Sequence, residues 1–297
     1  MASPPSLFDM RKLAMQRART AKSPESAWFL HEYAAKQIAD RLEAINRDFL
    51  RPAIVGWRAG DWRSRIGLSH RCTCVPDDQD LSLNDDEHDL VILALSLHWS
   101  NDPVGQLIQA RRALEPDGLF LAVLFGGRTL FELRTALAHG ESRIEGGISP
   151  RVAPMGDIRD LGDLVARAGL ALPVADSDDL QVTYESPLVL MRDLRAMGET
   201  NAMADRRKSC FRRDTLATAI GHYEDQFGDG SGRVMATFEM IFLSGWAPHE
   251  SQPQPLRPGR ATTRLADALG TEEHRGPGGP RRNRDSWQGC AVGGLDA

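Results

Sequence analysis

Apolar residues in the middle of the chain gather in short continuous runs, separated by amphipathic stretches and turn residues. The runs at 52–57, 88–95 and 118–125 are almost entirely apolar, which is typical of strands covered on both faces of a parallel sheet. Between the last two runs, residues 103–114 place apolar side chains at helical spacing. Strand, helix and strand in this order predict a right-handed βαβ unit.

The same reading extends the fold in both directions. A β-rich run at 237–246 is expected to join the sheet late, and short strands at Val174 and 180–184 are expected to flank an acidic turn at 176–179. Further helices are predicted by apolar periodicity at 24–46, 157–168, 187–197 and 214–227. The sequence therefore predicts an α/β protein.

Composition divides the chain of 297 residues into three parts. Residues 1–50 form an expected helical segment, and 51–250 form the α/β domain with helical insertions. Residues 251–297 are rich in Pro, Gly and Arg and are expected to be largely disordered after 270.

Composition also restricts the classes of function. Hydrophobic content of 41% and charged content of 26% are ordinary for a globular protein, and the net charge of −5 implies no general attraction to nucleic acid. No run is long enough to span a membrane. Cys72 and Cys74 form a C-x-C pair with no second pair, so no metal site is expected.

The small number of cysteines fits a protein of a reducing compartment, which is the cytoplasm, or the mitochondrial matrix if the source is eukaryotic. The basic N-terminus is interpreted as a solvated helix face, with an organellar presequence as the alternative.

Several blocks resemble a subfamily of the class I S-adenosylmethionine (SAM) methyltransferase superfamily, of methyltransferase type 11. The subfamily includes the arginine hydroxylase that serves as an assembly factor of respiratory complex I, and it is akin to the BioC-type methyltransferases. The blocks are HDLVILALSLHWSNDP (88–103), RRALEPDGLFLAVLFGGRTLFELR (111–134), GGISPRVAP (146–154), RDLGDLVARAGL (159–170), LMRDLRAMGETNA (190–202) and TFEMIFLSGWAPHESQ (237–252).

The resemblance implies a doubly wound, Rossmann-like sheet of seven strands that is mostly parallel, with a late antiparallel strand. It implies SAM at the C-terminal ends of the strands, where such sheets bind ligands. A glycine-rich turn after the first strand would approach the methionine part, and an acid ending the second strand would bond the ribose. An acid after the third strand and the loop after the fourth would flank the adenine.

The glycine turn departs from the family pattern D-x-G-x-G-x-G. Gly56 and Gly60 match its outer glycines, whereas Ile54 replaces the acid and Arg58 replaces the middle glycine. Trp57 and Arg58 add bulk where the backbone would meet the ligand.

The second departure is a missing stretch of chain. Residues 72–78 match the family's third strand and its acid, with Asp77 in the adenine-side position. Only residues 61–71 remain for a helix, a strand and a second helix, and one parallel crossover needs about a dozen residues or more. We therefore predict a sheet short by at least one strand near the second-strand edge, without the ribose-binding acid.

The resemblance makes Gly56, Gly60, Asp77, Leu95, Ser96 and Trp99 the candidate cofactor-binding residues. Asp77 either contacts adenine or is a solvated turn acid. Trp99 either walls the adenine pocket or fills core.

Other polar groups near the strand ends carry open alternatives. His98 is the candidate acid or base, with a hydrogen-bonded structural histidine as the alternative. Thr129 is expected to cap the helix that follows it. The polar stretches 198–201 and 246–251 either shape a substrate or partner surface or pack as loops.

Three functions remain open from the sequence. The first is a SAM-dependent member of the superfamily that acts on a protein substrate in complex I assembly, as the arginine hydroxylase does. The second is a cofactor-free pseudoenzyme that acts as an assembly or interaction factor, favoured by Ile54, Arg58 and the missing strand. The third is a BioC-type methyltransferase of an acyl carrier or a small molecule.

Overall fold

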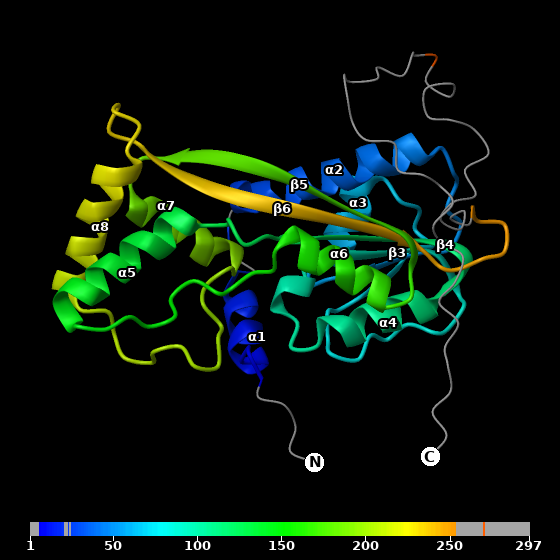
Figure 1. Ribbon diagram of the computed structural model, residues 1–297, viewed down its shortest axis with the longest axis horizontal. Helices are drawn as coiled ribbons and strands as arrows, with labels where there is room; N and C mark the ends of the chain where they lie inside the picture. The colour runs from blue at the N-terminus through cyan, green and yellow to red at the C-terminus, as the bar shows by residue number, and fades with distance from the viewer. Residues whose placement is uncertain (1–5, 21–22, 24, 254–269, 271–297) are drawn as a thin grey trace, which may run out of the picture. The chain divides into compact units, whose positions relative to one another are not determined.

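A mixed sheet forms the centre of the protein (Figure 1). The computed structural model describes residues 6–20, 23, 25–253 and 270, and within them the sheet has six strands in the order β2-β1-β3-β4-β6-β5. The strands are β1 (Pro52–Val55), β2 (Thr73–Val75), β3 (His88–Ala94), β4 (Leu114–Phe125), β5 (Ala171–Tyr184) and β6 (Val234–Trp246). β6 runs antiparallel to both of its neighbours, β4 and β5, and the other strand pairs are parallel. This confirms the predicted mostly parallel sheet with a late antiparallel strand.

Helices cover both faces of the sheet, as the near-continuous apolar runs require. On one face α2 (Phe29–Ile45) and α3 (Ala59–Ile66) pack on a core that includes Ile54. On the other face α4 (Pro103–Ala113) and α6 (Ile158–Arg167) pack on a core that includes Ala53 and Val55. Successive side chains of a strand point to opposite faces, so β1 contributes to both cores and is buried throughout.

The edge beyond β1 confirms the predicted loss of a strand. β2 pairs directly with β1 in parallel, with Ala53 opposite Thr73 and Val55 opposite Val75. The chain between them forms only α3 and a turn. Among the described residues, no strand lies between β1 and β2, and the acid that would end such a strand and bond the ribose is therefore absent.

The opposite edge differs from the sequence-based prediction. Residues 171–184 form one continuous strand instead of two short strands around an acidic turn, because they pair with β6 along their length. The acids of the expected turn are held by partners outside the strand: Arg41 binds Asp176, Tyr33 binds Asp178 and Arg128 binds Asp179. An edge strand that exposes alternate residues tolerates such polar positions.

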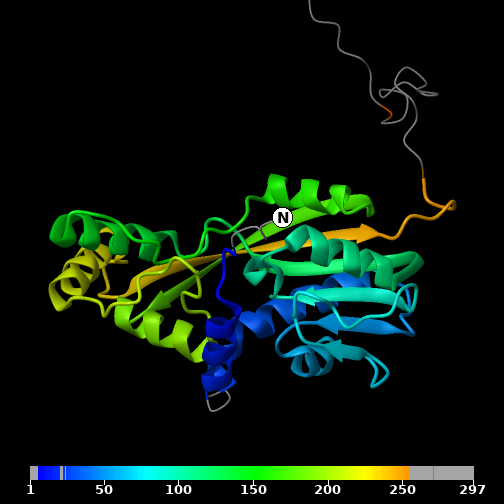
Figure 2. The ribbon, with the colours of Figure 1, turned by 90° about the horizontal axis from the view of Figure 1, so that it is seen from below.

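A group of helices lies at the far end of β5 and β6 (Figure 1). It comprises α5 (Phe131–Glu145), α7 (Pro187–Met197) and α8 (Arg213–Phe227). The N-terminal helix α1 (Met10–Arg19) lies between this group and the parallel strands (Figure 2). The predicted helices are confirmed at α2, α4, α6, α7 and α8, although α2 is preceded by a separate 3-10 turn, η2 (Glu25–Trp28).

The described residues up to Gln252 belong to one compact unit. Among the described helices, none has the length and apolar character needed to cross a membrane. The expected disorder after residue 270 falls outside the described residues, and the division into segments 1–50, 51–250 and 251–297 stays a prediction.

Candidate functional site

The C-terminal ends of β1, β2 and β3 meet at one edge of the sheet and bring the candidate residues together. The turn that begins at Gly56 is tied to β2, since the Gly56 backbone N–H donates to the Val75 carbonyl at 3.0 Å. The same glycine lies against the last residue of β3, Ala94. Asp77 follows β2, and Leu95 follows β3.

The two retained glycines have different surroundings. A Cβ atom on Gly56 would lie 2.8 Å from the Ala94 carbonyl oxygen, whereas a Cβ on Gly60 would meet nothing within 4 Å. Gly56 is therefore required by strand packing, whether or not a ligand approaches it. Gly60 lies in the first turn of α3 and faces open space, where a ligand has room.

We predict that Gly56→Ala lowers the free energy of unfolding by about 1–3 kcal/mol, because neither backbone segment is able to move away from the new methyl group. Gly60→Ala is the matched control and should leave stability unchanged or raise it by up to about 1 kcal/mol, since alanine favours the helix. Chemical denaturation of both variants measures the difference. Equal stabilities would remove the packing requirement from Gly56.

Asp77 is not a solvated turn acid, because it is 8% exposed. Its carboxylate accepts a hydrogen bond of 2.8 Å from the guanidinium of Arg17 on α1, and both side chains are buried. The Arg17 guanidinium also lies 5.7 Å from the centre of the Trp57 ring. Arg17 of the N-terminal helix is thus bound to Asp77, the acid that the resemblance assigns to the adenine side.

Aromatic and basic side chains fill the space beside the glycine turn. Arg58 stacks at 3.9 Å on the ring of Trp28 and pairs with Asp61. Trp62, which is 1% exposed, donates a hydrogen bond of 3.1 Å from its indole nitrogen to His31 Nδ1. A histidine that accepts at Nδ1 carries its proton on Nε2 when neutral.

Burial lowers the pKa of His31 to about 4, so this imidazole is neutral in the folded protein at pH 7. The unfolded chain takes up a proton near pH 6.5, and the folded protein does so only near pH 4. Stability is therefore complete above pH 6.5 and falls as the pH drops from 6.5 to 4.

We predict that His31 accounts for a loss of about 3 kcal/mol across this window, because each pH unit between the two pKa values contributes about 1.36 kcal/mol. The unfolding free energy of the wild type should therefore fall more steeply than that of His31→Gln between pH 7 and pH 4. Parallel curves would mean that the buried imidazole does not cause the loss.

The loop after β3 is strained and holds polar atoms without partners. Leu95 has a positive φ of 47°, a conformation that costs a non-glycine residue about 1–3 kcal/mol and recurs at functional sites. Ser96 Oγ and His98 Nδ1 are buried and have no hydrogen-bond partner among the described residues. Buried polar atoms are normally satisfied, so these two atoms are available to a group from outside the chain.

Glu199, which follows α7, completes the cluster. Its Oε2 accepts a hydrogen bond of 2.9 Å from the Trp99 indole nitrogen and lies 3.4 Å from His98 Nε2. Burial by itself raises the pKa of Glu199, but the hydrogen bond from His98 and the charges of His98 and Arg17 together hold the pKa below its usual value. Glu199 is therefore an ionised carboxylate whose side chain is only 10% exposed.

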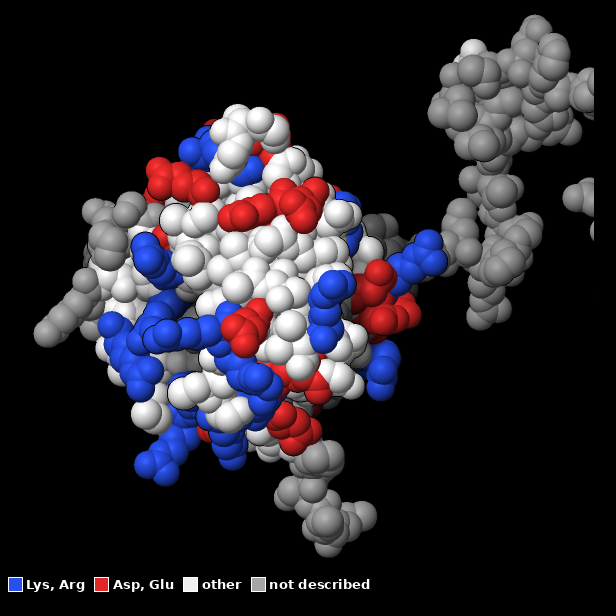
Figure 3. Space-filling view, turned by 90° about the vertical axis from the view of Figure 1, so that its left-hand side faces the viewer, with Lys and Arg blue, Asp and Glu red and all other residues white. Residues whose placement is uncertain are grey.

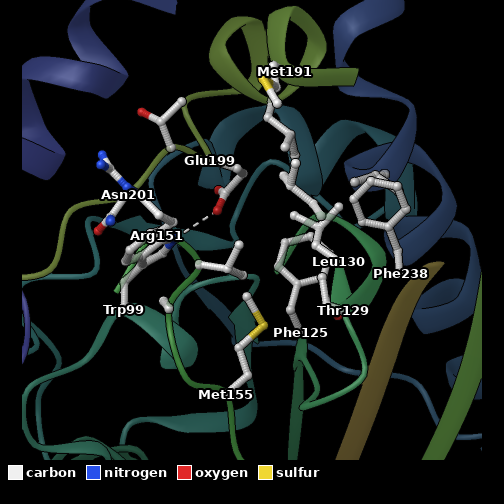
Figure 4. Close-up of a pocket in the computed structure, with 16 residues that line it drawn as sticks. Trp99, Phe125, Thr129, Leu130, Arg151, Met155, Met191, Glu199, Asn201 and Phe238 are labelled. Carbon is white, nitrogen blue, oxygen red and sulfur yellow. Dashed lines mark hydrogen bonds between the residues drawn. The ribbon is translucent and has the colours of Figure 1, made fainter. Parts of the chain in front are cut away.

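Glu199 lines a largely apolar cavity of about 160 Å³ (Figure 4). Trp99 and Phe125 contribute from the strand ends, and Thr200 and Asn201 follow Glu199 at the rim. The other lining residues are Leu30, Thr129, Leu130, Leu133, Arg151, Val152, Ala153, Met155, Met191, Leu194 and Phe238. The cavity is therefore lined both by the loop after β3 and by the helical group.

One predicted role is wrong, and two central residues had no signal in the sequence. Thr129 does not cap α5, because its hydroxyl donates to the Glu239 carbonyl and accepts from the Glu239 backbone N–H on β6. Arg17 and His31 were not predicted as site residues. Arg17 is 60 positions from its partner Asp77, and His31 is 31 positions from its partner Trp62. The cofactor-binding roles assigned to Gly56, Gly60, Asp77, Leu95, Ser96 and Trp99, and the acid or base role assigned to His98, stay predictions. Among the described residues, no three His, Cys, Asp or Glu side chains are grouped to hold a metal ion.

The residues fit SAM in part. Space is free above Gly60, and Ser96 and His98 offer unpartnered polar atoms. The described chain has no second-strand acid for the ribose, and Asp77 is already bound to Arg17. The glycine turn would therefore hold the methionine end and the loop after β3 would flank the adenine, whereas the nucleoside end lacks its usual carboxylates.

Comparison with known proteins agrees with the fold. A family described as a methyltransferase domain matches residues 62–122. The curated protein "Arginine-hydroxylase NDUFAF5, mitochondrial" of Danio rerio is 41% identical over 237 residues, which cover 80% of this chain and 70% of that protein. The Homo sapiens protein of the same name is 35% identical over 286 residues, covering 88% and 83%. A "Malonyl-[acyl-carrier protein] O-methyltransferase" of Nitrosospira multiformis is 35% identical over 193 residues, covering 63% and 60%.

The doubly wound sheet agrees with the methyltransferase-domain match over residues 62–122. Identity extends well beyond that domain and over most of the length of the two NDUFAF5 proteins. The chain therefore belongs to the NDUFAF5 arginine-hydroxylase family, which confirms the resemblance seen in the sequence.

Proposed function

We propose that this protein acts on an arginine side chain of a protein substrate during assembly of respiratory complex I, as an arginine hydroxylase. Family membership over 88% of the chain is the observation that carries the proposal. The buried carboxylate of Glu199 supports it, because it gives the cavity the charge that an arginine requires. SAM is the proposed cofactor, held at the Gly56–Gly60 turn and the loop that begins at Leu95. Mitochondria are the proposed location where the source is eukaryotic, since the named relatives are mitochondrial.

Complementation tests this function. The chain, carrying a mitochondrial targeting sequence, is expressed in human cells that lack the endogenous relative. Native gels then measure assembled complex I, and mass spectrometry of the complex I subunits measures hydroxylated arginine. We expect both to be restored. Expression of the folded protein without recovery of either would contradict the proposal.

A second function is favoured by the altered corner of the sheet. The absent strand between β1 and β2 and the Arg17–Asp77 pair both weaken the nucleoside end of the site, which suits an assembly factor that acts without a cofactor. Recovery of complex I assembly without recovery of hydroxylated arginine in the same cells would select this function.

A further inference from the structure

Glu199 places a negative charge at the wall of an otherwise apolar cavity. Both hydrogen bonds of Glu199 with described side chains go to Oε2, from Trp99 and His98, and Oε1 is not among the fully buried atoms that lack a partner, so it stays accessible. A buried charge is costly unless an opposite charge and further hydrogen bonds satisfy it. The cavity therefore favours a ligand that brings a cation and N–H donors.

Nearby arginines of the protein do not fill this role, because they are held by other carboxylates. Arg17 is paired with Asp77 at 2.8 Å. Arg151, which lines the same cavity, is bound to the buried Glu141 and lies over the Phe211 ring. His31 is neutral at pH 7 because burial lowers its pKa to about 4.

The size of the cavity restricts the group that enters. A cavity of about 150 Å³ accommodates benzene, so the 160 Å³ present here suits about six heavy atoms. Whole small-molecule sites are larger, at about 300–1,000 Å³. The cavity is thus sized for one side chain, and the walls of Phe125, Phe238 and Leu130 suit its apolar stem.

We propose that this cavity is a guanidinium-binding subsite, in which Glu199 receives the side chain of a substrate arginine. The choice of arginine over other cations rests on the proposed function. A guanidinium is planar and presents several N–H donors to a carboxylate, and the Trp99 ring offers a face that attracts cations.

The rim of the cavity indicates the kind of segment that carries the arginine. A groove next to Thr200 is lined by Lys12, Arg19, Arg192 and Arg195, and none of these four is paired with a carboxylate of the described residues. Lys and Arg side chains gather around a hollow on this side of the molecule (Figure 3). Although the whole chain carries a net charge of −5, this groove is basic. The substrate arginine is therefore flanked by acidic residues.

Calorimetry with synthetic peptides tests the subsite. The probe is a five-residue capped peptide with a central arginine and an aspartate two positions to each side. The matched peptide carries citrulline, which has the shape of arginine without the charge. For the wild type, citrulline should weaken binding by about ten-fold or more, as loss of a charged hydrogen-bonded pair implies. Failure of the arginine peptide to bind at about 1 mM, or equal binding of both peptides, would overturn the proposal.

Variants locate the charge that the peptide meets. Glu199→Gln should reduce the preference for arginine over citrulline to less than about two-fold, while Glu87→Gln, an exposed acid at the start of β3, should retain it. The double variant Arg192→Gln/Arg195→Gln should lose the preference for aspartate over asparagine flanks and keep the preference for arginine. If Glu199→Gln abolishes SAM binding and leaves the peptide preference intact, the cation that Glu199 meets belongs to SAM and the subsite is wrongly assigned.

The experiments can reject the proposed function and the proposed arginine subsite independently of each other. Successful complementation with an unaltered peptide preference in Glu199→Gln would remove the subsite and retain the function. Failed complementation with the preferences described above would remove the function in complex I assembly and retain an arginine-binding cavity.

Discussion

Replacement of Trp62 by alanine should lower the free energy of unfolding by about 3–5 kcal/mol, the range for a large aromatic side chain removed from a core. Trp62 is 1% exposed and anchors α3, the short helix that stands where a longer crossover would be expected. Its loss also leaves His31 Nδ1 without the 3.1 Å hydrogen bond that it accepts. Urea denaturation at pH 7 measures the change.

Two controls separate the contributions of Trp62. Trp62→Phe retains most of the apolar volume and removes the N–H donor, so it should cost about 1–2 kcal/mol. Trp57→Ala changes a neighbouring, only partly buried tryptophan and should cost less than Trp62→Ala. If Trp62→Ala cost no more than Trp57→Ala, α3 would not be anchored in this way.

Replacement of Arg17 by methionine should also destabilise the protein by about 3–5 kcal/mol, because it leaves the Asp77 carboxylate buried and unpaired. The pair is 2.8 Å apart, and the two side chains are 9% and 6% exposed. The double variant Arg17→Met/Asp77→Leu should regain most of the loss, since buried pairs are often replaced by apolar residues at little cost.

Thermal and chemical unfolding of the single and double variants measure this coupling. An exposed pair, Arg112 with Asp85, supplies the control, and Arg112→Met should change stability by less than about 1 kcal/mol. A small effect for Arg17→Met, or additive losses in the double variant, would mean that α1 is not held on the site by this pair.

The central sheet was predictable because its strands leave local patterns. The apolar runs that became β1, β3 and β4 are buried on both faces, so no exposed face interrupts them. The missing strand followed from the family match at residues 72–78, since residues 61–71 are too few for a helix, a strand and a second helix. The acidic stretch at 176–179 was misleading, because its charges are neutralised by residues far away in sequence.

The site was only partly predictable for a related reason. The β3 loop and the glycine turn carry family motifs within a few residues. The contact of Arg17 with Asp77 and that of Glu199 with Trp99 each join distant elements, and no periodicity or composition reports such contacts. Glu199 was recognised as polar, but its burial depends on how α7 meets the β3 loop.

The most direct measurement is a calorimetric titration of the wild-type protein with SAM. The ribose acid has no strand, and Asp77 is bound to Arg17. Loss of each charged hydrogen bond removes about 1.5–3 kcal/mol, equivalent to about ten- to hundred-fold in affinity. We therefore predict a dissociation constant of about 100 µM or weaker, and tighter binding by Arg17→Met, in which Asp77 is released. A dissociation constant near 1 µM that does not change in Arg17→Met would contradict the weakened nucleoside site.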